Sequence, residues 1–222
     1  MADRCPTAVI VDFGLGNIYS LKSACLSVGF ETMVSSDPDP IFSSDLVILP
    51  GVGAFGDAMT SLTRLSLCEP LRDRAEAGGP ILGICLGMQL LMSESEELGR
   101  WNGLGIVKGS VRRLQANAKI PQVGWNRILP SPVGQGPPWA LSPLRGIPEG
   151  EYMYFVHAFH VQPEDPGVVL AQTVYGGETY CSGLRYKNVF GFQFHPERSG
   201  PAGIAVYRNL AQWARLNGLH SC

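Results

Sequence analysis

The chain has 222 residues, of which 45% are hydrophobic, and its formal net charge is −2. That length allows one sizeable core, and the near-neutral charge balance gives no general attraction to nucleic acid or to an anionic membrane surface. No apolar run of about 18 residues is present, and the segment from Met1 to Pro6 lacks the apolar core of a signal peptide, so we expect a cytoplasmic protein with no nucleic-acid and no membrane partner.

Apolar runs alternate with helix-like segments through the N-terminal half. The runs at 8–11, 46–49 and 80–84 are short and continuous, as buried strands are. Apolar residues at helical spacing predict helices between these runs, one from Asn17 to Gly29, one through Met59 and Leu65, and one near Leu71 to Ala77. This order predicts βαβ units, and therefore a parallel sheet that is covered on both faces.

Short alternating strands replace this pattern from Gly105 onward. They are expected over residues 107–114, 152–161, 168–174 and 189–194 as antiparallel meanders, before a last helix over roughly 203–216. Residues 130–148 contain six prolines and no periodicity, which favours a surface loop over a domain linker. The predicted fold is α/β, an open doubly wound, mainly parallel sheet with helices on both faces and an added antiparallel strand region in the C-terminal half.

Neither disulfides nor a metal site are expected. The six cysteines form no C-x-x-C pair, and a core of this size needs no disulfide staples. His157 and His160 are three apart on one predicted strand and should point to opposite faces, so the four histidines give no zinc-like cluster. No residue pattern indicates an organic cofactor.

Cys85 lies in the segment GICLGMQLL, residues 83–91, where a strand-like run meets a helix-compatible one. Glycines at 83 and 87 relieve the crowding of so sharp a turn, as in the elbows that expose a catalytic nucleophile above an α/β sheet. Taken alone, the pattern fits a buried structural cysteine beside a tight turn equally well.

A histidine follows at the end of another predicted strand, in FGFQFHPE, residues 190–197. A cysteine nucleophile needs a general base, and the base needs a third group that fixes its orientation. His195 and Glu197 are the candidates for these two roles. The segment alone could be a polar strand end, but together with Cys85 it predicts a catalytic triad.

Three motifs, GICLGMQ, PGVGAFGDAM at 50–59 and FQFHPE, closely resemble those of the class I, triad-type glutamine amidotransferases. More narrowly, DFGLGN at 12–17, PGVGAF, GWN at 124–126 and YFVH at 154–157 resemble the glutaminase subunits of imidazole glycerol phosphate synthases. The resemblance implies one amidotransferase domain over residues 1–222 that hydrolyses L-glutamine through a cysteine thioester. It also implies a heterodimer with a separate cyclase subunit, a (β/α)8 barrel, which uses the ammonia in histidine biosynthesis.

The resemblance extends to residues around the triad. The amide of Leu86 follows the nucleophile, as in other elbow enzymes, and the amide of Val52 is the second expected oxyanion donor, although residues 51–53 could be an ordinary strand-to-helix turn. Contacts to the substrate glutamine are expected from Gly53, Gln89, Glu97, Ala158 and Phe159. Glu97 could instead be a solvated charge in an acidic run. Ala158-Phe159 stands where the family usually has Ser-Tyr, so only backbone contacts are carried over at 158 and 159. Arg198 stands where the family usually has Lys.

The cyclase subunit is expected to dock on a face formed by Asn17, Trp125, Asn126 and Tyr154, although Trp125 could equally belong to the core. Two other functions stay open on the sequence alone. One is a subunit of an anthranilate, aminodeoxychorismate or pyridoxal phosphate synthase, and Met88 argues against the first two because many chorismate-linked relatives place His there. The other is a non-catalytic subunit of the same fold. The presence of all three triad residues argues against this second alternative.

Overall fold

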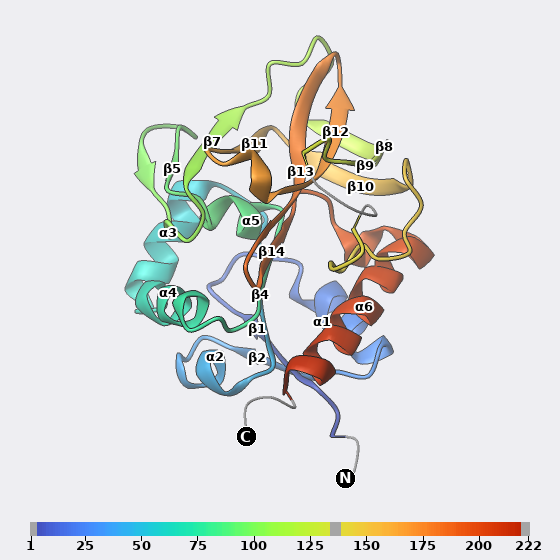
Figure 1. The fold of residues 1–222 in the computed structure, drawn as a ribbon. Coiled ribbons are helices and arrows are strands. Elements are labelled where there is room, and N and C mark those ends of the chain that lie inside the picture. The colour runs from blue at the N-terminus through green and yellow to red at the C-terminus, as the bar shows by residue number, and fades with distance from the viewer. Residues whose placement is uncertain (1–3, 134–138, 219–222) are drawn as a thin grey trace.

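The computed structural model describes residues 4–133 and 139–218. A twisted sheet runs through its centre, with helices packed on both faces (Figure 1). One half of the sheet is parallel, in the order β2-β1-β3-β4-β14. The bounds of these strands are Thr7–Val11 for β1, Glu31–Ser35 for β2, Leu46–Leu49 for β3, Ile81–Ile84 for β4 and Val189–Phe192 for β14. The predicted doubly wound α/β sheet is therefore confirmed.

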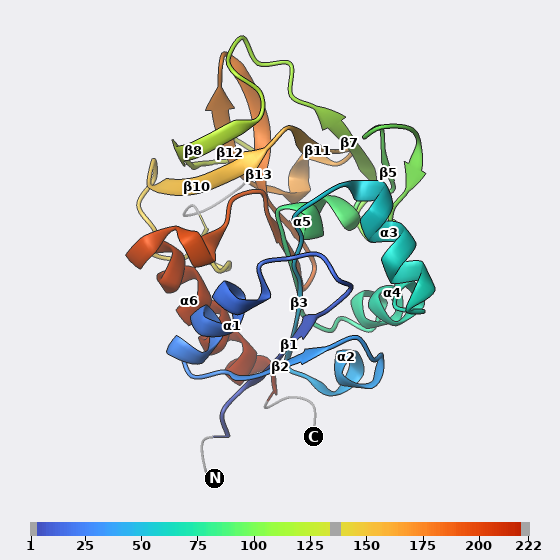
Figure 2. The same cartoon turned by 180° about the vertical axis from the view of Figure 1, so that it is seen from behind.

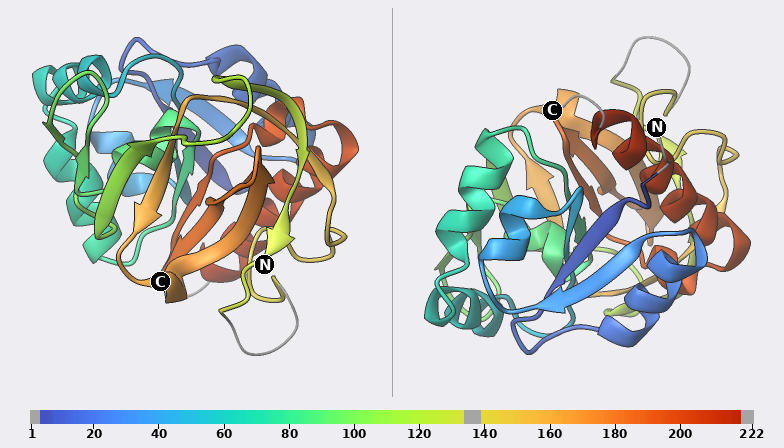
Figure 3. Two further views of the ribbon diagram at one scale, coloured as in Figure 1. Left: turned by 90° about the horizontal axis from the view of Figure 1, so that it is seen from above. Right: turned by 90° about the horizontal axis from the view of Figure 1, so that it is seen from below.

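Helices enclose the parallel strands from two sides, as the views from behind and from below show (Figures 2 and 3). Helices α1 (Ile18–Ser27) and α6 (Gly200–Gly218) cover one face. The other face carries α2 (Asp39–Ser43), α3 (Phe55–Arg64), α4 (Cys68–Glu76) and α5 (Leu86–Leu90). The two-residue repeat of a strand explains the two cores: in β1, Ile10 packs in the α1–α6 layer, whereas Val9 and Val11 pack in the other.

The antiparallel half of the sheet continues from β14 through β13, β11 and β7, with short strands at its far edge. The bounds are β5 Glu94–Ser95, β6 Trp101–Asn102, β7 Gly109–Arg113, β9 Leu129–Pro130, β11 Phe159–Pro163, β12 Val169–Tyr175 and β13 Glu178–Tyr186. The expectation that β14 belongs to an antiparallel meander is wrong in part. It pairs antiparallel with β13 but parallel with β4, and all its residues are buried, as in a central strand covered on both faces.

A separate two-stranded sheet pairs β8 (Gln122–Arg127) with β10 (Tyr152–His157), and it lies at the upper end of the molecule in Figure 1. The single strand predicted over 152–161 is in fact two strands, β10 and β11, that belong to different sheets and are divided at Ala158. The break turns the chain, so His157 and His160 both lie against the ring of Tyr180, with centroids at 5.2 and 5.6 Å. The prediction that these two histidines point apart is therefore wrong.

Part of the proline-rich segment 130–148, residues 134–138, lies outside the described residues. From Trp139 onward it forms turns, and the side chains of Trp139, Leu144 and Ile147 are buried in the α1–α6 layer. Asn209 of α6 also donates to the carbonyl groups of Pro143 and Arg145, at 2.8 Å each. This part of the segment is thus anchored to the core. No helix within the described ranges is long and apolar enough to cross a membrane.

Candidate active site

Cys85 forms the joint between β4 and α5, and its backbone is strained. Its φ of 53° lies in the left-handed region, which non-glycine residues rarely adopt. The glycines beside it are required by space: a Cβ on Gly87 would lie 1.8 Å from the carbonyl oxygen of Leu49, and one on Gly83 would lie 2.7 Å from that of Gly87. The close approach of α5 to β3 and β4 therefore fixes the cysteine at the carboxyl edge of the sheet, as an elbow does.

His195 reaches the same edge from the neighbouring strand. Ile84 of β4 and Phe192 of β14 are partners in the parallel register, and the Cys85 amide donates to the Phe192 carbonyl at 2.8 Å. Glu197 follows in a single helical turn, Pro196–Arg198, and its Oε1 lies 2.8 Å from His195 Nδ1. The structure thus brings the three predicted triad residues together at the carboxyl edge of β4 and β14.

The triad is almost completely buried from solvent, which strengthens the interactions among its charges. The side chains of His195 and Glu197 are only 4% and 1% exposed. Burial by itself lowers the pKa of His195, but the interactions of the ring with the Cys85 sulfur and the Glu197 carboxylate outweigh it and raise the pKa to about 10. The imidazole is therefore protonated at neutral pH and can donate a proton from Nε2.

Two groups other than His195 contact the Cys85 sulfur. The thiol faces the Val156 carbonyl oxygen at 3.7 Å, and Gln193 Nε2 donates to the sulfur at 3.5 Å. His195 Nε2 is buried and has no hydrogen-bond partner of normal geometry within the described ranges. Catalytic hydrogen bonds are often loose before substrate binds and tighten in the complex. Gln193 was not among the predicted site residues, although a polar residue between Phe192 and Phe194 is a visible signal in the sequence.

The two expected oxyanion donors belong to segments that touch, the loop after β3 and the start of α5. A Cβ on Gly51 would lie 2.6 Å from the Cβ of Leu86, so the loop after β3 packs directly against the start of α5. Gly53 has a φ of +114°, a conformation that favours glycine. Val52 itself is 42% exposed. The loop that carries Val52 therefore lies against the residue that follows the nucleophile, and the role of Val52 and Leu86 as donors stays a prediction.

Two of the residues expected to bind glutamine, Gln89 and Glu97, make hydrogen bonds within the chain. Gln89 is 4% exposed, and its Nε2 donates to the Phe159 carbonyl at 2.9 Å and to Gln193 Oε1 at 3.2 Å. Glu97 is half-buried rather than fully solvated, and its Oε2 accepts from the amide of Phe55, the first residue of α3, at 2.6 Å. Burial raises the pKa of Glu97, the Phe55 amide opposes this, and nearby Asp57 adds to it.

The outer face of the β8–β10 sheet exposes large apolar side chains. Val123 and Trp125 are 60% and 55% exposed, so the alternative that Trp125 belongs to the core is wrong. The rings of Trp125 and Tyr154 meet edge to face at 6.1 Å, and the Arg198 guanidinium lies 4.5 Å above Tyr154.

The two asparagines of the expected docking face bond within the chain. Asn126 Nδ2 donates to the Val174 carbonyl at 2.9 Å, and Asn17 Oδ1 caps α1 by accepting from the Ser20 amide at 3.5 Å. Their contact with a partner stays a prediction.

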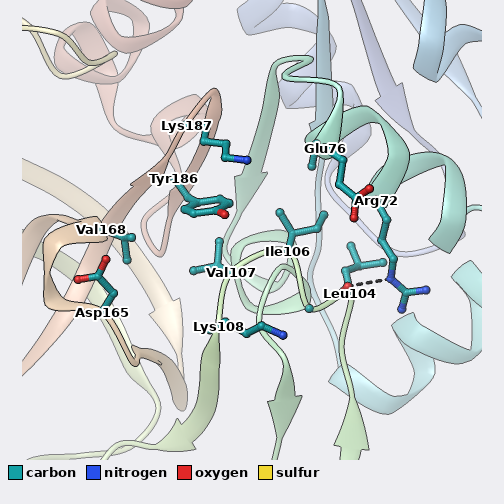
Figure 4. A pocket seen from close by; sticks show the side chains of 12 residues that line it. Arg72, Glu76, Leu104, Ile106, Val107, Lys108, Asp165, Val168, Tyr186 and Lys187 are labelled. Carbon is teal, nitrogen blue, oxygen red and sulfur yellow. Dashed lines mark hydrogen bonds between the residues drawn. The ribbon is translucent and has the colours of Figure 1, made fainter.

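A cavity of about 470 Å³ lies apart from this constellation (Figure 4). Its lining includes Arg72, Glu76, Lys108, Asp165 and Lys187, and no predicted site residue is among the described residues that line it. Charges of both signs surround it, so it favours no single class of ligand.

Comparisons with known proteins agree with this geometry. Residues 9–212 match the family described as Glutamine amidotransferase class-I. The chain is 46% identical over 208 residues to "Imidazole glycerol phosphate synthase subunit HisH" of Symbiobacterium thermophilum, covering 94% of this chain and 93% of that protein. It is 44% identical over 210 residues to the protein of the same name of Aquifex aeolicus, covering 93% and 96%.

Solved structures show the same fold at lower identity. PurLQS from Thermotoga maritima aligns with a TM-score of 0.73 and 23% identity, covering 97% of this chain and 100% of that one. A glutamine amidotransferase from the same organism aligns with a TM-score of 0.58 and 18% identity, covering 96% and 88%. The family match over most of the chain and the identity to the two HisH relatives decide the assignment: the chain belongs to the class-I glutamine amidotransferases and, within them, to the family of imidazole glycerol phosphate synthase subunits called HisH.

Proposed function

We propose that the chain is the glutaminase subunit of imidazole glycerol phosphate synthase. It hydrolyses L-glutamine to glutamate and ammonia and supplies the ammonia to a separate cyclase subunit in histidine biosynthesis, in the cytoplasm. One observation carries the proposal: Cys85, on a strained elbow, interacts with a buried His195 whose Nδ1 is held by Glu197 at 2.8 Å. No residue pattern in the chain offers a second site for the acceptor chemistry, so that chemistry is assigned to the partner.

The proposed reaction starts from a Cys85 thiolate and a protonated His195. The Cys85 thiolate attacks the side-chain carboxamide of glutamine, and His195 donates its Nε2 proton to the nitrogen as the carbon–nitrogen bond breaks. Ammonia leaves and a γ-glutamyl thioester remains on Cys85. Neutral His195 then takes a proton from water, the hydroxide attacks the thioester, and the thiolate is released with glutamate. Glu197 keeps the proton on Nδ1 and stabilises the imidazolium throughout.

The amides of Val52 and Leu86 are proposed to stabilise the tetrahedral oxyanion. The segments that carry them are in contact, which supports a joint role. Because Val52 lies in an exposed, glycine-flanked loop, we infer that this donor is completed only when the partner is bound. Gly53, Gln89, Glu97 and the backbone of Ala158 and Phe159 are proposed to hold the substrate.

The cyclase subunit, a (β/α)8 barrel in this proposal, is assigned to the outer face of the β8–β10 sheet, and Asn17 is proposed to contact it as well. Exposed aromatic rings beside arginine side chains are typical of protein interfaces. Strand β10 connects this face to the triad: the His195 amide donates to the Tyr154 carbonyl at 2.9 Å, and the Tyr154 amide donates to Ser199 Oγ at 3.0 Å. Direct transfer to a docked partner also keeps ammonia from being protonated in water, where it would lose its nucleophilicity.

Cys85→Ala tests the proposal in the complex with the cyclase. Synthesis from glutamine should be lost, whereas synthesis from added ammonium salt should persist, because the acceptor chemistry lies in the partner. Glutamine-dependent turnover that survives the substitution would refute the mechanism. Identification of a bound protein other than the cyclase after co-purification would refute the pathway.

A further inference from the structure

We propose that Gln193 is a further catalytic residue, whose amide donates a hydrogen bond to the Cys85 sulfur and stabilises the thiolate, with the Phe159 carbonyl fixing the direction of that bond. The inference rests on the proposed function only in taking Cys85 as the nucleophile.

Gln193 lies where a polar side chain is costly unless it is fully bonded. It follows β14 directly, between Phe192 and Phe194, and is completely buried. Its Nε2 lies 3.5 Å from the Cys85 sulfur, and its Oε1 accepts from Gln89 Nε2 at 3.2 Å. Both ends of the amide are therefore engaged, one by the nucleophile and the other by a second buried amide.

The direction of these hydrogen bonds follows from which groups can donate and which can only accept. The Phe159 carbonyl can only accept, so the group of Gln89 that faces it at 2.9 Å must be the NH2. The same NH2 also faces Gln193, which must present its oxygen there. The remaining end of the Gln193 amide, the NH2, is thus the end that faces the sulfur. Rotating the Gln89 amide would place two acceptors in contact, and rotating the Gln193 amide would place two NH2 groups in contact.

His157 reinforces this orientation from the other side of the carbonyl. Its Nδ1 lies 2.9 Å from the Phe159 oxygen and must carry the proton, because that oxygen has none to give. Burial is the main cause that lowers the pKa of His157 to about 3, so the ring is neutral and stays in this one tautomer. The Phe159 oxygen therefore accepts from two donors, Gln89 and His157, and both of its lone pairs are used.

The other neighbour of the sulfur favours the wrong state for catalysis. The Val156 carbonyl oxygen, at 3.7 Å, accepts from a thiol but repels a thiolate. A buried thiolate needs donors, and Gln193 and His195 are the side chains placed to supply them. Gln193 thus supplies a donor that offsets the repulsion of a thiolate by the Val156 carbonyl.

The test is the pH profile of alkylation at Cys85 in the full chain, measured with iodoacetamide and site-specific mass spectrometry. Gln193→Met removes the donor and keeps the length of the side chain, and Gln193→Glu puts a carboxylate against the sulfur. Loss of a hydrogen bond to a charged group should raise the midpoint of the profile by about one pH unit for Met, a loss of about tenfold in thiolate below the midpoint, and by more for Glu. The midpoint is read rather than the rate, because a more basic thiolate is intrinsically more nucleophilic.

Gln122→Met is the matched control. Gln122 is also buried, at 2% exposure, but its amide contacts Tyr180 and not the sulfur, so its midpoint should equal that of the unsubstituted chain. A folded Gln193→Met chain with an unchanged midpoint would overturn the proposal.

If the substituted chains do not fold, NMR of the unsubstituted chain decides: the Gln193 side-chain amide protons should shift as Cys85 ionises, and their failure to do so would overturn the proposal as well. Ammonia release from glutamine by the unsubstituted complex tests the proposed function separately, since the alkylation profile does not depend on it.

Discussion

Replacing Glu197 with glutamine should lower the pH at which His195 loses its proton. The change keeps the shape of the side chain and removes the negative charge that lies 2.8 Å from Nδ1. In the unsubstituted chain, burial opposes protonation of the ring, and the interactions with Cys85 and Glu197 overcome burial and raise the pKa of His195 to about 10. The variant loses the charge of one of these two partners.

The magnitude follows from the burial of the pair. With side-chain exposures of 4% and 1%, solvent screens the interaction little, so the value for a hydrogen bond to a charged group applies, about 1.5 to 3 kcal/mol. Because a change of one in pKa corresponds to about 1.4 kcal/mol, the pKa of His195 should fall by about one to two in Glu197→Gln.

The same shift predicts a pH dependence of folding stability. The pKa of folded His195, about 10, lies above its ordinary value of 6.5, so the protonated ring stabilises the folded state fully below pH 6.5, and this stabilisation is lost as the pH rises through 10. The difference in unfolding free energy between the unsubstituted chain and the variant should therefore be largest near neutral pH and below, and should shrink as the pH approaches 10.

NMR titration of ring-labelled histidine measures the first effect, and denaturant unfolding at several pH values measures the second. Glu178→Gln is the matched control, because it removes the carboxylate that lies 3.2 Å from His160 Nε2 and should leave the titration of His195 unchanged. A His195 that titrates near 6.5 in the unsubstituted chain, or at the same pH in Glu197→Gln, would refute the reasoning.

Three further substitutions test other parts of the structure. Gly87→Ala should abolish glutamine hydrolysis in the complex, because a Cβ there would lie 1.8 Å from the Leu49 carbonyl oxygen, and a fully active variant would show that the elbow geometry is wrong. Trp125→Ala should weaken binding of the cyclase in titration calorimetry while changing the unfolding free energy by no more than about 0.5 kcal/mol, since the side chain is 55% exposed; an unchanged Kd would remove Trp125 from the docking face. Tyr180→Phe should lower the unfolding free energy by about 1 to 3 kcal/mol in urea, because buried Gln122 and His157 share its hydroxyl as a partner. Tyr175→Phe, at an exposed hydroxyl bonded to Lys119, is its control and should cost less.

The sequence predicted the triad because each member has its own local signal. One signal is a cysteine between two glycines at the end of a strand, and another is a histidine at the end of a second strand. These two signals predict a catalytic pair if the two strands are parallel neighbours in the sheet. Adjacency was the step that local patterns could not supply: β4 and β14 are separated by most of the C-terminal half, and only their pairing shows that Cys85 and His195 share an edge.

The partners of the triad were harder to predict, because they depend on side chains from several elements. Gln193 bonds to Cys85 of the elbow and to Gln89 of α5, and neither contact has a sequence spacing that identifies it. Strand β8 was missed because neither of its faces is uniformly apolar: Gln122 and Asn126 alternate with Trp125 and Arg127. The division of β10 from β11 at Ala158 was missed because both halves are apolar enough to form one continuous strand.

Strand β10 belongs to two surfaces at once, and this limits how either can be engineered. Its backbone contacts the Cys85 sulfur through the Val156 carbonyl and the His195 peptide through Tyr154, while the side chain of Tyr154 packs with Trp125 on the outside. Substitutions made there to tune affinity for a partner and substitutions made inside to tune turnover act on one shared strand, so their effects should not add. A library designed for this chain must vary both sides together.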